Sequence, residues 1–381
     1  MPSAMLLRRA KLAAQAPAAP APSPPQGDAL EIRDLRAWPL REPVSGRRYT
    51  VIKLETRAGL SGWGEAAEAS PRELAEARQA ILGLPATAHE VARRRVIAPG
   101  LNAAVNMAML DIAGRHAKAP IYQVLGGPTR HKVRALAPLA GDTDEALAAS
   151  MKQAQQAGFR AFLVPMPRGQ WRNQGQSFVQ RVRRRMDSLR AAAGDGMDFV
   201  LDGGGALTPG DAASLAAALE PSHLLWFDEP CAVSNHGAIR KLAAENVTPI
   251  GFGRDVHRAG DFQDLLREES LDILRPSLGS TSLLSIRKLA ALAETYYTAV
   301  APYHDGGPIA TAAALHLAAS LPNFFIQQIP LAVGEDRRMR DEIAGGPAER
   351  VRDGFAELLA GPGLGITVNE KALEKYLERA A

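Results

Sequence analysis

The sequence predicts an α/β fold, a parallel TIM-like (β/α) barrel that follows a small α+β domain. Short apolar runs recur roughly every 25–30 residues from position 132 onward, with alanine-rich amphipathic segments between them, as in repeated strand–helix units. Two of these runs, 198–202 (DFVLD) and 224–229 (LLWFDE), end in carboxylates. In such a barrel the C-terminal strand ends are where side chains meet, so we expect Asp202 and Glu229 to converge, as oxygen ligands of a divalent cation do.

Composition shifts divide the chain into four segments. Residues 1–28 are rich in alanine and proline and lack a hydrophobic period, which predicts a disordered tail. Residues 29–131 begin with alternating strand-like runs and continue with helical spacing over 71–118, which predicts an α+β capping domain. The barrel is expected over 132–345. The last segment, 346–381, contains a glycine- and proline-rich turn at 361–365 and is expected to return to the cap.

Eight apolar runs are candidates for the barrel strands. They lie at 133–139, 161–164, 199–201, 224–227, 249–252, 271–274, 298–301 and 324–326. We expect a (β/α)7β arrangement in which the eighth helix is altered. The alternative is an open doubly wound sheet, which the strand count and the lack of a glycine-rich dinucleotide fingerprint disfavour.

Composition narrows the class of protein. Of the 381 residues 46% are hydrophobic and 23% charged, which is typical of globular proteins, and no apolar run approaches the ~18 residues of a membrane span. Cys231 is the only cysteine, which excludes an internal disulfide and fits the cytoplasm. An Arg-Arg pair near the start allows export as the alternative. The net charge of +4 comes largely from the run at 181–190, which we interpret as a solvated helix face and not a nucleic-acid site.

Several short phrases, in order and at matching spacing, resemble the enolase superfamily in its mandelate racemase and sugar-acid dehydratase branch. They are GLSGWGE (59–65), LGG (125–127), Asp202, DEP (228–230), LRP (274–276), AP (301–302), PNF (322–324) and GPGLG (361–365). The resemblance covers nearly everything after residue 29. It implies a cap that closes the barrel mouth, a bound Mg²⁺, and removal of the proton next to a substrate carboxylate, with the metal stabilising the resulting enediolate.

Only part of the site that the resemblance implies is present. Asp202 and Glu229 match two of the three metal ligands, although Gly204 stands where an asparagine is usual. The third position, after the fifth strand, falls on Arg254, and Asp255 follows it. Two arrangements remain open. Either Arg254 replaces the metal and no metal is bound, or a bulged strand end brings in Asp255 as the third Mg²⁺ ligand.

The usual proton acceptors of the family are also substituted. The second-strand lysines fall near Leu163 and Pro165, the sixth-strand aspartate is Ser277, and the seventh-strand histidine is Tyr303. The candidate catalytic residues that remain are Tyr303, the neighbouring His304 and Asp305, Arg254, and more weakly His257.

Four further residues are expected to bind substrate. Arg47 and Arg48 lie in a cap loop, Arg168 lies in a polar insert after the second strand, and Gln328 occupies the position of a family glutamate. The sequence therefore predicts a relative of acid-sugar dehydratases and racemases with a rearranged site, leaning towards a hydro-lyase or racemase. The alternative is a non-catalytic binder of a small carboxylate or sugar. By resemblance we expect a homo-oligomer, and we expect no nucleic-acid or membrane partner.

Overall fold

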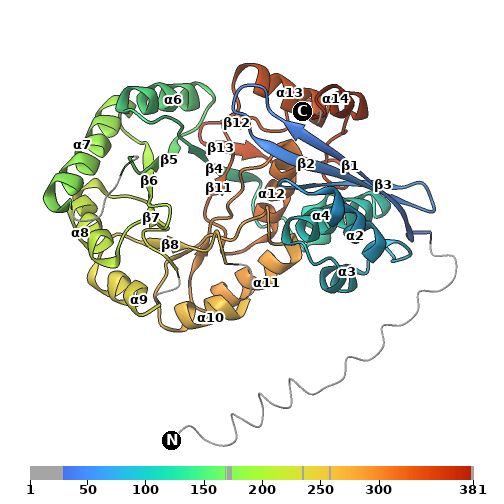
Figure 1. The fold of residues 1–381 in the computed structure, drawn as a ribbon, viewed down its shortest axis with the longest axis horizontal. Helices are drawn as coiled ribbons and strands as arrows, with labels where there is room; N and C mark the ends of the chain where they lie inside the picture. Colours follow the sequence, from blue (N-terminus) through green and yellow to red (C-terminus); the bar gives the residue numbers. More distant parts are fainter. Residues whose placement is uncertain (1–28, 168, 170–173, 234–235, 257–258, 379–381) are drawn as a thin grey trace, which may run out of the picture.

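The computed structural model describes residues 29–378 apart from 168, 170–173, 234–235 and 257–258. Figure 1 shows a ring of strands surrounded by helices, with a second lobe of strands and helices beside it. This arrangement confirms the predicted class, a (β/α) barrel with an N-terminal α+β cap. Predictions for the N-terminal tail, Arg168 and His257 lie outside the described residues.

The cap is built on an antiparallel meander of β1 (Ile32–Arg41), β2 (Arg48–Thr56) and β3 (Ser61–Ala66). Its helices are α2 (Pro71–Ile81), α3 (His89–Arg95), α4 (Pro99–His116) and α5 (Ile121–Val124). The start of α2 has a capping box, in which Ser70 and Glu73 satisfy each other's backbone N–H groups. Strand β3 packs so closely on α4 that a Cβ on Gly64 would come within 1.9 Å of the Ala104 carbonyl oxygen. Glycine at this position is therefore required for the cap to pack.

The barrel contains eight parallel strands in sequence order. They are β4 (Lys132–Pro138), β5 (Ala161–Pro165), β6 (Asp198–Asp202), β7 (Trp226–Asp228), β8 (Ile250–Phe252), β9 (Ile273–Leu274), β10 (Ala299–Val300) and β11 (Gln327–Gln328). The ring closes because Phe324 bridges Val300 of β10 while β11 pairs with β4. The eighth strand was predicted at 324–326 from its apolar run. The paired residues of this strand are instead two buried glutamines, because the last strand of this barrel faces polar side chains in the interior.

Helices cover the outside of this ring. They are α6 (Asp144–Gln156), α7 (Gly175–Ala193), α8 (Pro209–Leu219), α9 (His236–Glu245), α10 (Ala259–Arg267), α11 (Leu283–Glu294), α12 (Pro308–Ser320) and α13 (Gly334–Ala344), with the short η1 (Glu220–Ser222) after α8. Every residue of α12 is buried, because this helix lies between the barrel and the cap. Among the described residues, no helix combines the length and apolar character that a bilayer crossing requires.

The C-terminal segment contacts both domains. Strands β12 (Val351–Arg352) and β13 (Phe355–Glu357) form a hairpin, and β13 pairs antiparallel with the beginning of β4. The chain then reaches the cap, where α14 (Glu370–Lys375) packs beside β1 and Trp38 donates a hydrogen bond of 2.6 Å to Glu374. The segment therefore extends the barrel sheet before it returns to the cap.

Candidate functional site

The C-terminal ends of neighbouring strands bring charged side chains together at the barrel mouth. Asp202 ends β6, Asp228 ends β7, and Arg254 follows β8 after Gly253. Gly253 has a φ of +139°, and a Cβ there would come within 2.9 Å of Phe262. Only glycine therefore allows the turn that carries Arg254 over the neighbouring strand ends.

The guanidinium of Arg254 lies between two carboxylates. Its Nη1 donates to Asp202 Oδ2 at 3.0 Å, and its Nη2 donates both to Asp202 Oδ1 and, at 2.6 Å, to Asp228 Oδ2. Only 15% of the arginine side chain is exposed, and none of the Asp228 side chain is. Burial by itself lowers the pKa of Arg254, but the adjacent Asp228 and Asp202 outweigh it and raise that pKa. This side chain is a permanent cation inside the mouth.

Glu229 lies beside this cluster but makes a different contact. Its Oε1 accepts hydrogen bonds from the backbone N–H of Gly253 at 2.7 Å and of Arg254 at 2.8 Å. Burial, and then the charge of Asp228, raise the pKa of Glu229 to about 7. Its φ of +42° is a strained conformation for glutamate, of the kind that concentrates at functional sites. The sequence predicted that Arg254, in place of the metal, would pair with both Asp202 and Glu229. The guanidinium does bond Asp202, but its second carboxylate is Asp228 and not Glu229.

A second arginine lies deeper in the barrel. Arg275, fully buried, donates to Asp228 Oδ1 at 3.0 Å and to Gln328 Oε1 at 2.8 Å, while Trp226 also donates to Asp228 Oδ1. Asp228 is therefore shared by two guanidinium groups. The alternating order Arg275, Asp228, Arg254, Asp202 leaves each charge with an opposite neighbour, which is what a buried charge requires.

These donors do not fit Mg²⁺ as they stand. The guanidinium fills the space between Asp202 and Asp228, and Asp255, the alternative third ligand, is exposed. Over the described residues, no group of three or more His, Cys, Asp or Glu side chains is placed to hold a metal ion. A divalent ion here would have to displace a paired arginine.

Tyr303 and His304 follow β10 but face different surroundings. The Tyr303 ring lies 5.2 Å from the Arg254 guanidinium carbon, and burial followed by the charge of Asp305 raises the pKa of its phenol. His304 is buried: Gly306 N–H donates to its Nδ1, so Nε2 carries the proton and donates to Thr311 Oγ1 at 3.1 Å. Burial lowers the pKa of His304 to about 3. Both ring nitrogens are thus engaged inside the protein, which does not suit a base that must reach a substrate.

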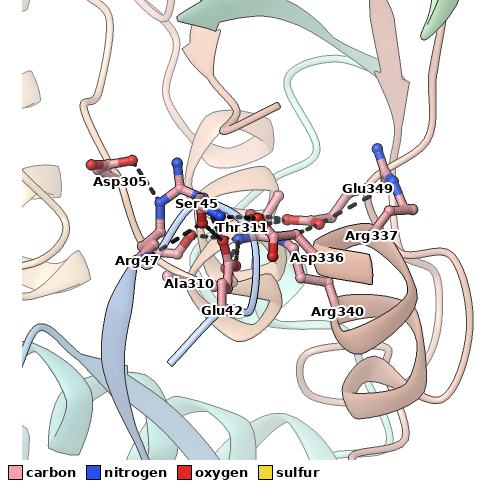
Figure 2. Close-up of polar contacts among 12 residues, drawn as sticks. Glu42, Ser45, Arg47, Asp305, Ala310, Thr311, Asp336, Arg337, Arg340 and Glu349 are labelled. Carbon is pink, nitrogen blue, oxygen red and sulfur yellow. Dashed lines mark hydrogen bonds and ion pairs between the residues drawn. The ribbon is translucent and has the colours of Figure 1, made fainter. Parts of the chain in front are cut away.

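A charged network holds the cap loop between β1 and β2 on the barrel (Figure 2). Arg47 donates from Nε to Asp305 at 2.9 Å and from Nη1 to Glu42 at 2.7 Å. Glu42 in turn accepts a 2.6 Å hydrogen bond from the fully buried Arg340 of α13. The backbone N–H groups of residues 44 and 45 both donate, at 2.8 Å, to the buried carboxylate of Asp336. The loop is therefore fixed against α13.

Of the remaining expected substrate residues, Gln328 lines the mouth, and Arg48 lines a neighbouring cavity beside the cap loop. The Oε1 of Gln328 accepts from Arg275 and its Nε2 donates to the His304 carbonyl. Arg48 pairs with Glu68 at 3.0 Å and with Glu378 at 3.1 Å on the cap. Arg168 lies outside the described residues.

Two adjoining cavities open between the cap and the barrel, with volumes of about 530 Å³ and about 420 Å³. Both are lined by Arg47, Tyr303 and Asp305, so the Arg47–Asp305 pair stands where they meet. Asp202, Arg254 and Gln328 line the smaller cavity only. We take this cavity as the candidate ligand site, because it contains the strand-end charges.

The sequence reasoning missed Asp228, Arg275, Asp336 and Arg340. Asp228 and Arg275 each lie at a strand end and belong to a recognised phrase, DEP (228–230) and LRP (274–276), which was the available signal. Nothing local marks Asp336, since its partners at 44 and 45 lie almost three hundred positions away along the chain. Arg340 pairs with Glu349, nine positions further along, as well as with the distant Glu42.

Comparisons with known proteins agree with this architecture. Residues 36–126 match the N-terminal domain family of mandelate racemase / muconate lactonizing enzyme, and residues 146–372 match the enolase C-terminal domain-like family. A D-galactonate dehydratase of Pectobacterium atrosepticum is 28% identical over 354 residues, which covers 87% of this chain and 91% of that protein. A second D-galactonate dehydratase, from Ralstonia nicotianae, is 28% identical over 85% of this chain and 89% of its own length. The crystal structure of a mandelate racemase/muconate lactonizing enzyme-like protein from Roseovarius sp. TM1035 superimposes with a TM-score of 0.81 at 26% identity, over 92% of this chain and 96% of that one.

Proposed function

We infer the function from one premise: this chain belongs to the enolase superfamily, in the group of mandelate racemase and muconate lactonizing enzyme, and is related to acid-sugar dehydratases. We propose that its barrel mouth binds a small carboxylate or sugar acid. We further propose that Arg254, and not Mg²⁺, supplies the positive charge at the position where the family holds its metal.

One observation carries this proposal, namely the guanidinium held between Asp202 and Asp228. A cation that already pairs with both carboxylates removes their net attraction for a second cation. Arginine also stays protonated at neutral pH, because its pKa lies far above neutrality, so the guanidinium remains a cation that competes with a metal ion. Both the charge of the guanidinium and the space that it occupies support the proposed replacement of the metal by Arg254.

Arg47 and Tyr303 are the groups that can meet an anionic ligand in the candidate cavity. A guanidinium has five N–H donors, and the bonds of Arg47 to Glu42 and Asp305 use two of its nitrogens. Because the pKa of Tyr303 is raised, its phenol keeps its proton at neutral pH and can donate to a ligand oxygen. Both contacts suit a carboxylate.

A second candidate function, removal of the proton next to the ligand carboxylate, is favoured by the place of Asp305. Its side chain is 54% exposed, lines both cavities and adjoins Tyr303. In this reaction the C–H bond breaks, the proton passes to the Asp305 carboxylate, and the electron pair remains in an enediolate. The negative charge of that enediolate would face the Tyr303 hydroxyl and the Arg47 guanidinium.

Metal analysis and ligand binding test the binding proposal. We expect the purified protein to contain no stoichiometric divalent metal, and its affinity for D-galactonate and smaller hydroxy acids to be the same with EDTA or with millimolar Mg²⁺. One tightly held Mg²⁺ per chain, or ligand binding that EDTA abolishes, would contradict the replacement of the metal by Arg254.

Proton exchange separates the catalytic function from binding alone. The protein is incubated with a panel of sugar acids in D₂O, and the signal of the proton next to the carboxylate is followed by NMR. If Asp305 is the base, exchange occurs and is lost in Asp305→Asn, while His304→Gln retains it. Ligand-dependent thermal stabilisation without exchange would identify a binder that does not turn over.

The assembly state and the compartment stay predictions. The family resemblance favours a homo-oligomer, and light scattering of the purified protein measures its mass directly. The cytoplasm is the expected compartment, with export as the alternative, and fractionation of cells that express the full chain distinguishes the two.

A further inference from the structure

Several polar groups on the wall of the candidate cavity are already bonded to the protein. Asp202 accepts from Arg254 and, at 2.9 Å, from the backbone N–H of Gly204. Both ends of the Gln328 amide have protein partners, and the Asp336 carboxylate accepts two backbone N–H groups. A sugar acid carries a hydroxyl on nearly every carbon, and each one that enters the site loses hydrogen bonds to water. Few groups on this wall are free to replace those bonds.

Apolar side chains make up much of the rest of the wall, next to the polar Ser45, Ser150 and Gln153. Leu163, at the position of a family lysine, lines the cavity together with Leu331. Two of the exposed large hydrophobic side chains of the described residues also lie here, Val44 at 64% exposure and Val333 at 37%. Exposed apolar side chains gathered in a concave site indicate contact with an apolar group of a ligand.

The apolar side of the cavity is held in place by buried contacts. Val44 belongs to the cap loop, whose backbone is bonded to Asp336 of α13, and Val333 directly precedes α13. The loop is held a second time through the pair of Glu42 and Arg340 (Figure 2). The two valines therefore belong to a preformed surface, so a ligand does not have to order them when it binds.

We propose that the ligand of this cavity is a small carboxylate with a branched alkyl end, and not a fully hydroxylated six-carbon sugar acid. The carboxylate would meet Arg47 and Tyr303, and the alkyl group would cover Val44, Val333 and Leu163. This inference rests on the proposed carboxylate site and names the class of molecule that the site selects. The names of the related D-galactonate dehydratases, if carried over to this chain, would instead suggest a sugar acid as the ligand.

Calorimetric titration of the full chain with two monocarboxylates tests the inference. The probes are 2-hydroxy-4-methylpentanoate and D-galactonate, which share a carboxylate and an adjacent hydroxyl but differ in the rest of the molecule. We expect the branched acid to bind at least about tenfold more tightly, since a single methylene group in an apolar pocket is worth about tenfold or more. The neutral 4-methylpentan-1-ol should bind at least about tenfold more weakly than the branched acid, because it lacks the charge that Arg47 meets.

A matched pair of variants assigns the preference to this wall. The double variant Val44→Thr/Val333→Thr keeps the shape of both side chains but removes apolar surface, and should weaken the branched acid by about three- to tenfold while leaving D-galactonate unchanged. The control Val247→Thr changes a valine that is 77% exposed and lies outside the cavity, and should change neither affinity.

The outcomes separate this inference from the proposed function. If D-galactonate binds as tightly as the branched acid, or more tightly, the alkyl preference is wrong while the carboxylate site stands. Equal weakening of both acids in the double variant would also overturn it, because the valines would then act only on the shape of the loop. If neither acid binds, the carboxylate site itself is refuted.

Discussion

Replacing Arg254 with glutamine tests the central feature of the site. The amide of Arg254→Gln keeps a polar side chain on the same backbone but removes the positive charge between Asp202 and Asp228. Two carboxylates then face each other with one cation fewer. We expect a loss of stability at neutral pH together with a new response to Mg²⁺ that the wild-type protein lacks.

The expected loss follows from the contacts of the guanidinium. Removing one partner of a buried charge pair costs about 3–5 kcal/mol of unfolding free energy. Asp228 keeps Arg275 and Trp226 as partners, and 18% of the Asp202 side chain reaches solvent. The loss should therefore lie at the lower end, about 3 kcal/mol. Mg²⁺ at a concentration of about 100 times its dissociation constant would raise the unfolding free energy of the variant by about 2.7 kcal/mol.

Denaturant unfolding with and without millimolar Mg²⁺ measures both effects. The control is Arg240→Gln on α9, whose side chain is 60% exposed and pairs with Glu268 at 3.5 Å. Such a surface pair contributes no more than about 1 kcal/mol, and we expect no response to Mg²⁺ in the control. The reasoning is refuted if Arg254→Gln is as stable as the wild type, or if Mg²⁺ stabilises the wild type equally.

Three further predictions concern the groups around the site. Arg340→Met leaves the buried Glu42 with Arg47 alone and the buried Glu349 with only the more distant Arg337, and should lower the unfolding free energy by about 3–5 kcal/mol. Arg338→Met on the same helix, 64% exposed, should cost less than about 1 kcal/mol by denaturant unfolding, and equal losses would contradict a special role for the buried network. Burial lowers the folded pKa of His304 from 6.5 to about 3, so its contribution to stability is complete above pH 6.5 and is lost as the pH falls towards 3. The pH profile of His304→Gln should lack this component, and an unchanged profile would count against burial of the neutral ring. The pKa of Glu229 is raised from 4.5 to about 7 in the folded protein, so its contribution to stability is complete below pH 4.5 and is lost as the pH rises through 7. In unfolding experiments Glu229→Gln should flatten this decline of stability with pH, and a decline that persists in full would rule out the assignment to Glu229.

Much of the fold could be predicted from the chain alone because it depends on local periodicity. The apolar runs of the barrel, the alternation in the cap strands and the glycines of β3 are each encoded within a few residues, and the structure has them in the predicted order. The eighth strand was displaced from its predicted position. Its ladder lies on the polar residues Gln327 and Gln328, which a search for apolar runs passes over.

The composition of the site was also readable in part. The strand ends predicted that Asp202 and Arg254 would meet, since parallel strands of a barrel place their C-terminal residues at one mouth. The other contacts of the site could not be predicted to the exact residue, because neighbouring side chains at a strand end point in different directions. Sequence alone could not decide that Asp228 and not Glu229 bonds the guanidinium, or that His304 turns away from the mouth.

By itself, the sequence determined which charged groups are available and near which strand ends they stand. Only the tertiary structure decided which of them pair, because ion pairs such as Arg340 with Glu42 join residues far apart along the chain that meet once the cap has docked. The same packing placed two valines in a cavity with few unbonded polar groups. Pairing and cavity shape depend on distances between elements, and no local pattern of residues contains those distances.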